Sequence, residues 1–283
     1  MELRNIQVGI QGSPNSFHDE VAKKHFGKHV EIIPFRSFRE SIEALSTNRV
    51  DYTVMAMENS IAGKILPNYE LILEYQAHVM AEIFQPIALH LVALPETSRE
   101  EIRTIRSHPM ALLQCTEFLA SLPEVEVVEA GDTALCVKEI AESRLTSTGA
   151  IAGYGAAARY GMKILQENIH SNAHNYTRFW ILTKGEIIPD KVNKASLSFC
   201  LQDKTGSLAD VQFIIRSEGL NLSALQSVLR PDTPEVYRFY ADVEFPHRTK
   251  FLRCVKALTP KCTELRILGE YQMSSKTFIH DKH

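Results

Sequence analysis

The stretch IQVGIQGSPNSFHDEVAKKHF, residues 6–26, decides the fold class of this chain. Apolar residues alternate with other residues over positions 6–10, which is the pattern of a β-strand. Ser16-Phe17-His18-Asp19 then resembles a capping box, and it opens a helical pattern that continues to about Phe26. A strand followed at once by a capped helix is the repeating unit of α/β proteins.

The same unit continues along the chain. A strand is expected over 29–35, a helix over 37–45 and a strand over 51–57, so the βαβαβ order predicts a mainly parallel sheet covered by helices. Further strands and helices follow as far as YTRFWILTK, residues 176–184, including a helix over ALLQCTEFLASL, residues 111–122. We predict two α/β lobes with crossings near residues 75–85 and 165–175, and a ligand between them.

The C-terminal third has a different order. KGEIIPDKVNKA is charged, contains a proline and has no period, so residues 185–195 are predicted to be a linker after a domain of residues 1–184. Strand, helix, strand, strand, helix and strand patterns then follow over residues 196–275. This βαββαβ order predicts a ferredoxin-like unit.

Composition restricts the class of partner. The 283 residues carry a formal net charge of -3, and 45% of them are hydrophobic, so the chain is typical of globular proteins and has no overall basic charge that would attract nucleic acid. Neither a secretory leader nor an apolar run of membrane-spanning length is visible. The expectation is a cytoplasmic protein with no membrane contact that binds small molecules or other proteins.

Polar residues follow several predicted strands, where ligands bind in open α/β sheets. Each of the four motifs also has an ordinary structural reading: a βα turn, a helix cap or turn, a helix start and an internal salt bridge. They are QGSPNS (Gln11–Ser16), ENSIAG (Glu58–Gly63), SHPMALLQC (Ser107–Cys115) and the pair Thr177-Arg178 within NYTRFWIL. A buried arginine needs a partner, so either a carboxylate of the chain or an external ligand is expected beside Arg178.

In combination, the motifs TRF, ENS and SHP…LLQC resemble those of prephenate dehydratases, followed by the ACT regulatory domain of that family. The resemblance extends from Val8 to about Tyr271. It implies an α/β fold with a two-lobed catalytic domain similar to type II periplasmic binding proteins and a ferredoxin-like ACT domain. It also implies conversion of prephenate to phenylpyruvate in phenylalanine biosynthesis. That reaction yields an aromatic ring and requires neither cofactor nor metal.

The resemblance assigns roles to individual residues. Arg178 would pair with a carboxylate of prephenate, Phe179 would pack beside the substrate, and the loop at Gly12 and Ser13 would bind a carboxylate through backbone N–H groups. Thr177 would stabilise the leaving hydroxyl as a hydrogen-bond donor, and Glu58 would act as a general acid if its pKa were raised. The remaining catalytic candidates, which would orient the substrate, are Asn59, Ser60, Ser107 and Gln114.

Two features near these motifs leave alternatives open. Where the family has Gly-Ser, this chain has Gly63-Lys64, and the additional cation either faces solvent or attracts the substrate. His108 and His174 are adjacent to motif residues, but structural or surface roles are expected for both.

The C-terminal unit resembles the family's effector-binding domain. Phenylalanine would bind between paired domains, so L-phenylalanine is the expected allosteric ligand and a homodimer or homotetramer the expected assembly. The residues assigned to this site are Gly206, Ser207, Leu208, Asn221, Leu222, Gln226 and Ser227. The family's ESRP segment is altered here, since Gln226 stands where the family has glutamate and two residues are added before Pro231.

Two other functions remain open. An arogenate dehydratase acts on a substrate in which an amine replaces the keto group, and these motifs do not separate the two substrates. A non-catalytic amino-acid sensor would have the same domains, although it has no need of the Thr177 hydroxyl.

Overall fold

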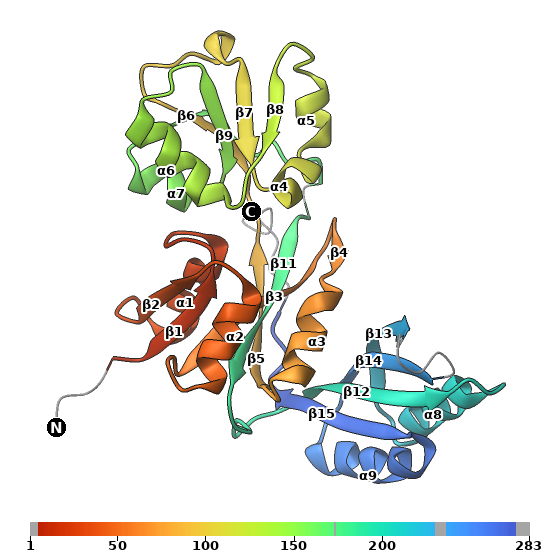
Figure 1. Ribbon diagram of the computed structural model, residues 1–283. Coiled ribbons are helices and arrows are strands. Elements are labelled where there is room, and N and C mark those ends of the chain that lie inside the picture. Colours follow the sequence, from red (N-terminus) through yellow and green to blue (C-terminus); the bar gives the residue numbers. More distant parts are fainter. Residues whose placement is uncertain (1–4, 173, 230–235, 276–283) are drawn as a thin grey trace. The chain divides into compact units, whose positions relative to one another are not determined.

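The computed structural model of this protein describes residues 5–172, 174–229 and 236–275 (Figure 1). The described residues form two compact units. The first is made mainly of residues 5–71 and 83–180, and the second of residues 72–82 and 181–274. Each unit is described by itself below.

Two sheets whose strands follow the same pattern lie mainly in the first unit; residues 78–82 and 181–183 of one of them are assigned to the second unit. One sheet has the order β2-β1-β3-β11-β5, with the short strand β4 paired to β3, and the other has the order β10-β6-β9-β7-β8. In the first sheet β11, the strand that follows the return of the chain from the second sheet, lies between β3 and β5. In the second sheet β6, the strand that follows the passage from the first sheet, lies between β9 and β10. The predicted fold class, two α/β lobes of the periplasmic-binding-protein type, is confirmed.

The elements of the first sheet alternate as the sequence predicts. Its strands are β1 (Gln7–Gln11), β2 (Glu31–Phe35), β3 (Tyr52–Asn59), β4 (Gly63–Lys64), β5 (His78–Pro86) and β11 (Tyr176–Thr183), and its helices are α1 (Phe17–Phe26), α2 (Phe38–Ser46) and α3 (Leu66–Glu74). β1 pairs in parallel with β2 and β3. Most residues of β3 and β11 are buried, as expected for central strands covered on both faces.

The second sheet is entered over residues 87–89 and left over residues 167–175. Its strands are β6 (His90–Ala93), β7 (Thr104–Ser107), β8 (Glu126–Glu129), β9 (Thr148–Ala152) and β10 (Lys163–Gln166). Its helices are η1 (Arg99–Glu101), α4 (Pro109–Leu113), α5 (Thr116–Ala120), α6 (Thr133–Ser143) and α7 (Tyr154–Arg159).

Two local expectations for this unit were wrong. The helix predicted over 111–122 is two short helices, α4 and α5, because the carbonyl of Gln114 accepts a hydrogen bond from the N–H of Ser171 instead of continuing the helix. Ser16 is the N-cap residue of α1 but makes no side-chain cap hydrogen bond. Instead, the Asp19 carboxylate accepts the N–H of Asn15 at 2.5 Å.

The second unit contains the predicted βαββαβ order. Its elements are β12 (Lys194–Gln202), α8 (Ser207–Ser217), β13 (Asn221–Leu229), β14 (Val236–Glu244), α9 (Arg248–Leu258), η2 (Thr259–Lys261) and β15 (Glu264–Tyr271). The sheet has the order β13-β14-β12-β15, and all its pairs are antiparallel. Apolar residues of the strands pack with Val211, Ile215, Phe251 and Cys254 of the helices into one core.

A buried polar cluster also belongs to the second unit. The Lys194 ammonium lies 3.0 Å from both carboxylate oxygens of Glu82 and 3.8 Å from Asp242. Asp242 accepts a hydrogen bond from the hydroxyl of Ser196, which also contacts the Tyr271 hydroxyl. β12 therefore begins at Lys194, within the residues expected to form a linker.

Candidate active site

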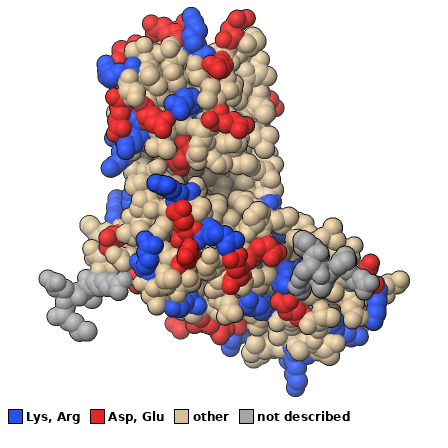
Figure 2. Space-filling model, viewed as in Figure 1, with Lys and Arg blue, Asp and Glu red and all other residues tan. Residues whose placement is uncertain are grey.

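A cavity of about 700 Å³ lies in the first unit. Figure 2 shows the surface hollowed between the two lobes of that unit. Residues of both lobes line the cavity, and they lie mostly at strand ends and helix starts. They include Gln11, Ser16, Phe17, His18, Phe38, Ala56, Asn59, Lys64, Ile65, Leu66, Ile87 and Leu89, together with His108, Met110, Gln114, Asp132, Thr133, Thr177 and Phe179.

Asn59, at the end of β3, organises the polar part of the wall. Its Oδ1 accepts the N–H groups of Ile61 and Ala62, at 2.9 and 3.0 Å, and so forms the turn between β3 and β4. Because two donors meet this oxygen, the other amide atom is the nitrogen. Nδ2 lies within 3.1 Å of three acceptors: Asn175 Oδ1, the Tyr176 carbonyl and Thr177 Oγ1.

The amide network extends to the other lobe. Asn175 Nδ2 donates to Gln114 Oε1 at 2.6 Å, and Gln114 lies between α4 and α5. Gln114 and Asn175 are both buried. Since Gln114 Oε1 is occupied as an acceptor, the side-chain amide has its Nε2 donors left for a ligand in the cavity.

Thr177 is positioned by the same network. β11 places its side chain on the cavity wall, and Oγ1 accepts from Asn59 Nδ2 at 3.1 Å. Among the described residues, no acceptor for its own proton is recorded, so the O–H group can donate into the cavity. A donor to Oγ1 also polarises the O–H bond and makes it a stronger hydrogen-bond donor.

An aromatic and imidazole cluster forms another part of the wall. The ring of His18 meets Phe179 edge to face, with centroids 4.9 Å apart, and Phe38 at 5.4 Å. Burial, together with His108, lowers the pKa of His18 to about 3, so the imidazole is neutral at pH 7. His18 Nε2 and Ser16 Oγ are buried, and neither has a hydrogen-bond partner in the part of the chain that the structure describes.

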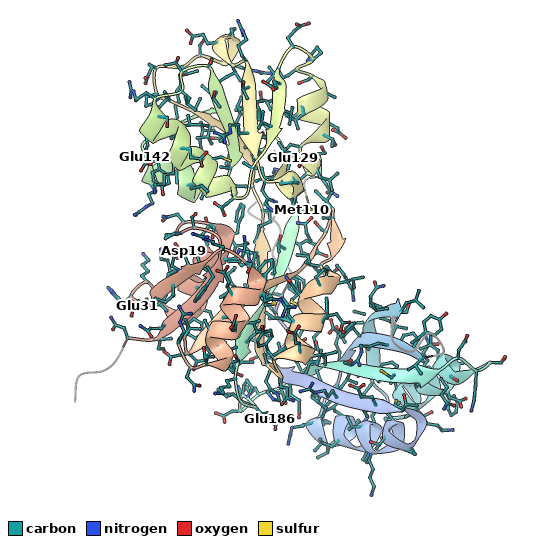
Figure 3. All side chains as sticks on the ribbon, viewed as in Figure 1. Asp19, Glu31, Met110, Glu129, Glu142 and Glu186 are labelled. Atoms are coloured by element: carbon teal, nitrogen blue, oxygen red, sulfur yellow. The ribbon has the colours of Figure 1, made fainter. Side chains whose placement is uncertain are left out.

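Two charged side chains line the cavity. Lys64 follows the Asn59 turn on β4, and its ammonium lies 5.9 Å from the centre of the Tyr69 ring. Asp132 caps α6: its Oδ1 accepts the N–H of Leu135 at 2.7 Å. Burial lowers the pKa of His108, whose Nδ1 accepts the N–H of Met110, a residue labelled in Figure 3 at the start of α4.

The structure brings together part of the set of predicted site residues. Thr177, Phe179, Asn59 and Gln114 all line the cavity. Glu58 is half-buried opposite Lys64 in the β3–β4 pair, but it is not among the described lining residues. Gly12 and Ser13 are not among them either; the neighbouring Gln11 and Ser16 line the cavity instead.

The two predicted serines bond to backbone outside the cavity wall. The Ser60 hydroxyl donates to the carbonyl of His174 and accepts the N–H of Tyr176, so it fastens the turn to β11. The Ser107 hydroxyl donates to the carbonyl of Ile151 at 2.6 Å and is fully buried.

Arg178 does not have the position expected of a substrate ligand. Successive residues of a strand point to opposite faces, so Thr177 and Phe179 face the cavity and Arg178 faces the other way. Its guanidinium lies 5.2 Å from the centre of the Trp180 ring and 6.0 Å from that of Phe84, and the side chain is 2% exposed. Arg178 is therefore not among the described residues that line the cavity, and its pairing with a substrate carboxylate stays a prediction.

Sequence reasoning missed several residues of this site. Asn175 was quoted as the start of NYTRFWIL but was given no role, although it joins Asn59 to Gln114. His18 was read only as part of a helix start, and Asp132 was given no role. Their common signal was a polar side chain directly after a predicted strand or before a helix.

The residues assigned to the effector site lie apart within the second unit. Gly206, Ser207 and Leu208 follow β12 and begin α8, whereas Asn221 and Leu222 begin β13. The register pairs Asn221 with Glu244 and Gln202 with Val236, so these two groups lie at opposite ends of the sheet. Gln226 and Ser227 belong to β13 and pair with Tyr240 and Phe239 of β14. Arg230 and Pro231 are outside the described residues.

Among the described residues, no helix is long and apolar enough to cross a membrane. On the face shown in Figure 2, basic and acidic residues are interspersed over the surface. A two-lobed α/β domain with a cavity of this size, an amide network and a threonine hydroxyl at its wall is typical of a protein that binds a small molecule.

Comparison with known proteins specifies the family. Residues 8–187 match the model of the prephenate dehydratase family. "Arogenate dehydratase/prephenate dehydratase 1, chloroplastic" of Arabidopsis thaliana is 31% identical, with 95% of this chain and 72% of that protein covered. "Bifunctional chorismate mutase/prephenate dehydratase" of Aquifex aeolicus is also 31% identical, with 95% of this chain and 74% of that protein covered.

A solved structure has the same fold. Prephenate dehydratase of Arthrobacter aurescens in complex with L-Phe superimposes with a TM-score of 0.86 at 24% identity, covering 96% of this chain and 92% of that one. The chain therefore belongs to the prephenate dehydratase family, and it is a carbon–oxygen lyase of that family.

Proposed function

We propose that this protein converts prephenate to phenylpyruvate, carbon dioxide and water in phenylalanine biosynthesis. The observation that supports this most is the position of the Thr177 hydroxyl, which accepts from Asn59 and lines the cavity, so that its proton is available to a ligand there. The amide network fixes this group before substrate binds. Preorganised donors of this kind stabilise charge that develops in a transition state.

The chemistry requires two contributions from the cavity: a hydrogen bond to the leaving oxygen and an apolar surrounding for the ring carboxylate. The ring carbon–oxygen bond breaks as its electrons leave with the hydroxyl, while the bond to the ring carboxylate supplies the electrons that complete the aromatic ring. Thr177 donates a hydrogen bond to the leaving oxygen, which departs as hydroxide and takes up a proton from solvent to become water. The ring carboxylate becomes neutral carbon dioxide, so an apolar surrounding such as Ile87, Leu89 and Phe179 favours its loss.

Turnover assays with both compounds decide whether the protein prefers prephenate or arogenate as its substrate. The Arabidopsis relative carries both activities in its name, so both substrates must be offered to the purified protein. We expect phenylpyruvate, detected by its ultraviolet absorbance, to form from prephenate at least ten times faster than phenylalanine forms from arogenate. Thr177→Val should reduce turnover about 100-fold or more, and Thr177→Ser, which retains the hydroxyl, should keep most of it.

Two outcomes would reject this proposal. Equal turnover by wild type and Thr177→Val would exclude the hydroxyl from the chemistry. A folded wild type that converts neither substrate would favour the sensor function instead.

The second unit is proposed to bind L-phenylalanine as an allosteric ligand. The Arthrobacter aurescens structure contains L-Phe, which supports this proposal. Gly206–Leu208 and Asn221-Leu222 lie at opposite ends of one sheet, so a single pocket that uses both groups needs two copies related by a twofold axis. This arrangement predicts a homodimer or a homotetramer. Absence of calorimetric binding, together with unchanged activity in millimolar phenylalanine, would reject the regulatory proposal.

A further inference from the structure

Lys64 lines the cavity, and the sequence left open whether this lysine faces solvent or attracts the substrate. Lys64 belongs to β4, and β4 is held to β3 by the pairs Glu58 with Lys64 and Asn59 with Gly63. The Asn59 turn connects the two strands, so the same residue that holds Thr177 also fixes the start of β4. Lys64 and Thr177 are therefore positioned relative to one another, and both line the cavity.

Lys64 is the cation of this wall at neutral pH. The lowered pKa values of His18 and His108 keep both imidazoles neutral, and Arg178 lies on the opposite face of β11. Of the described residues that line the cavity, Lys64 is the only lysine or arginine, and Glu58 lies directly opposite it in the β3–β4 pair. A dicarboxylate substrate needs such a group, because an anion that loses its water must be compensated.

The carboxylate of the wall has a different environment. Asp132 accepts the N–H of Leu135 with Oδ1, and its Oδ2 lies 2.5 Å from the point that a Cβ atom on Gly12 would occupy. Gly12 has φ +93°, so the loop can approach Asp132 only because residue 12 is glycine. The Asp132 charge is thus used in capping α6 beside the first loop.

We propose that Lys64 binds the side-chain carboxylate of the substrate and makes the site selective for a keto acid over an amino acid. This inference rests on the proposed function. The ring carboxylate must become apolar carbon dioxide, so a cation bound to it would stabilise the reactant and slow its loss. The side-chain carboxylate does not react and is the group that a cation can hold without this cost.

Selectivity follows from charge. In arogenate, an ammonium group stands on the carbon next to the side-chain carboxylate. Lys64 would then face two groups of opposite sign, and its attraction to the carboxylate would be offset by repulsion from the ammonium. In prephenate the same carbon carries a neutral keto group, so this repulsion is absent.

The test compares Lys64→Gln with Lys138→Gln, which removes one positive charge from the exposed surface of α6. Steady-state kinetics with both substrates should show that Lys64→Gln raises KM for prephenate at least tenfold while kcat changes less than threefold. The ratio of kcat/KM for prephenate to that for arogenate should fall at least tenfold. Lys138→Gln should reproduce the wild type. Equal losses with the two substrates, or no loss, would overturn the proposal.

A second measurement separates this proposal from the proposed function. Phenylpyruvate carries the side-chain carboxylate and keto group but no ring carboxylate, so its calorimetric Kd tests the Lys64 contact without turnover. We expect Lys64→Gln to weaken binding of phenylpyruvate at least tenfold. If wild type binds phenylpyruvate through Lys64 yet converts no prephenate, the proposed function fails and the Lys64 site stands. If wild type converts prephenate and Lys64→Gln binds phenylpyruvate normally, only the Lys64 proposal fails.

Discussion

Thr177 and Arg178 are neighbours on β11, but the two faces of this strand have different surroundings. On one face, Thr177 and Phe179 meet the cavity and the amide network from Asn59 to Gln114. On the other face, Arg178 lies against Trp180 and Phe84. The comparison teaches that a short motif can contain one residue for chemistry and one for packing, because strand residues alternate between faces.

The largest expected effect concerns the cavity face. Asn59→Asp retains the turn acceptor but replaces the donor that meets Thr177 with an oxygen. We expect kcat to fall about 100-fold, since the hydroxyl loses the bond that orients and polarises it. A steady-state assay that follows phenylpyruvate by its ultraviolet absorbance measures this change in kcat.

Ser60→Ala is the matched control for that prediction. It alters the same turn, and among the described residues its hydroxyl bonds to the backbone of His174 and Tyr176 and to no other group. A loss in Ser60→Ala as large as in Asn59→Asp would attribute the effect to the turn and would contradict the role assigned to the Asn59 amide.

The opposite face of β11 is tested by Arg178→Met. This change removes the guanidinium from between Trp180 and Phe84 and should lower the free energy of unfolding by about 2–3 kcal/mol. Denaturant titration measures the loss, and the KM of the folded variant should stay within about threefold of wild type. A KM that rises tenfold or more would restore Arg178 as a substrate ligand.

Acid should weaken the first unit through His18. Its pKa is about 3 in the folded protein and about 6.5 in an unfolded chain, so between these values the unfolded chain binds the additional proton. Stability therefore falls as the pH drops below 6.5, and His18 accounts for about 2 kcal/mol at pH 5. Unfolding at pH 7 and pH 5 should show a smaller pH-dependent loss in His18→Gln. An unchanged loss would place the titrating group elsewhere.

Ser107→Ala is expected to have the smallest effect. The hydroxyl donates to the buried carbonyl of Ile151 outside the cavity wall, and a bond of this kind contributes about 1 kcal/mol to stability. Thermal unfolding should detect this change, while kcat should agree with wild type within twofold. A large loss of kcat would return Ser107 to the catalytic set.

Much of the fold follows from local patterns. The strand and helix periods of residues 6–57 lead to a parallel sheet, and the βαββαβ order appears at the C-terminus. The interruption of the helix predicted over 111–122 and the start of β12 could not be predicted from local patterns. The interruption at Gln114 depends on the distant N–H of Ser171, and the start of β12 depends on the contact between Lys194 and Glu82, which are far apart in the sequence.

The candidate site was predictable to the extent that its residues lie at strand ends. Asn59, Gln114 and Thr177 were found in this way, because the sequence places each of them in a polar motif near a strand or a helix start. The direction of a side chain was harder to predict. Arg178, Ser107 and Glu58 are in the same motifs but are not among the described residues that line the cavity. Alternation along β11 accounts for Arg178 and a bond to backbone for Ser107. Asn175 was missed because its role depends on two long-range hydrogen bonds.

The most direct test compares Thr177→Val and Arg178→Met in one prephenate turnover assay, with each rate divided by the folded fraction of the sample. The account predicts that Thr177→Val stays as stable as wild type within about 1 kcal/mol and loses about 100-fold or more in kcat. Arg178→Met should unfold more readily and yet keep most of its kcat. If Thr177→Val keeps its turnover while folded Arg178→Met loses it, the assignment of chemistry to the cavity face of β11 is wrong.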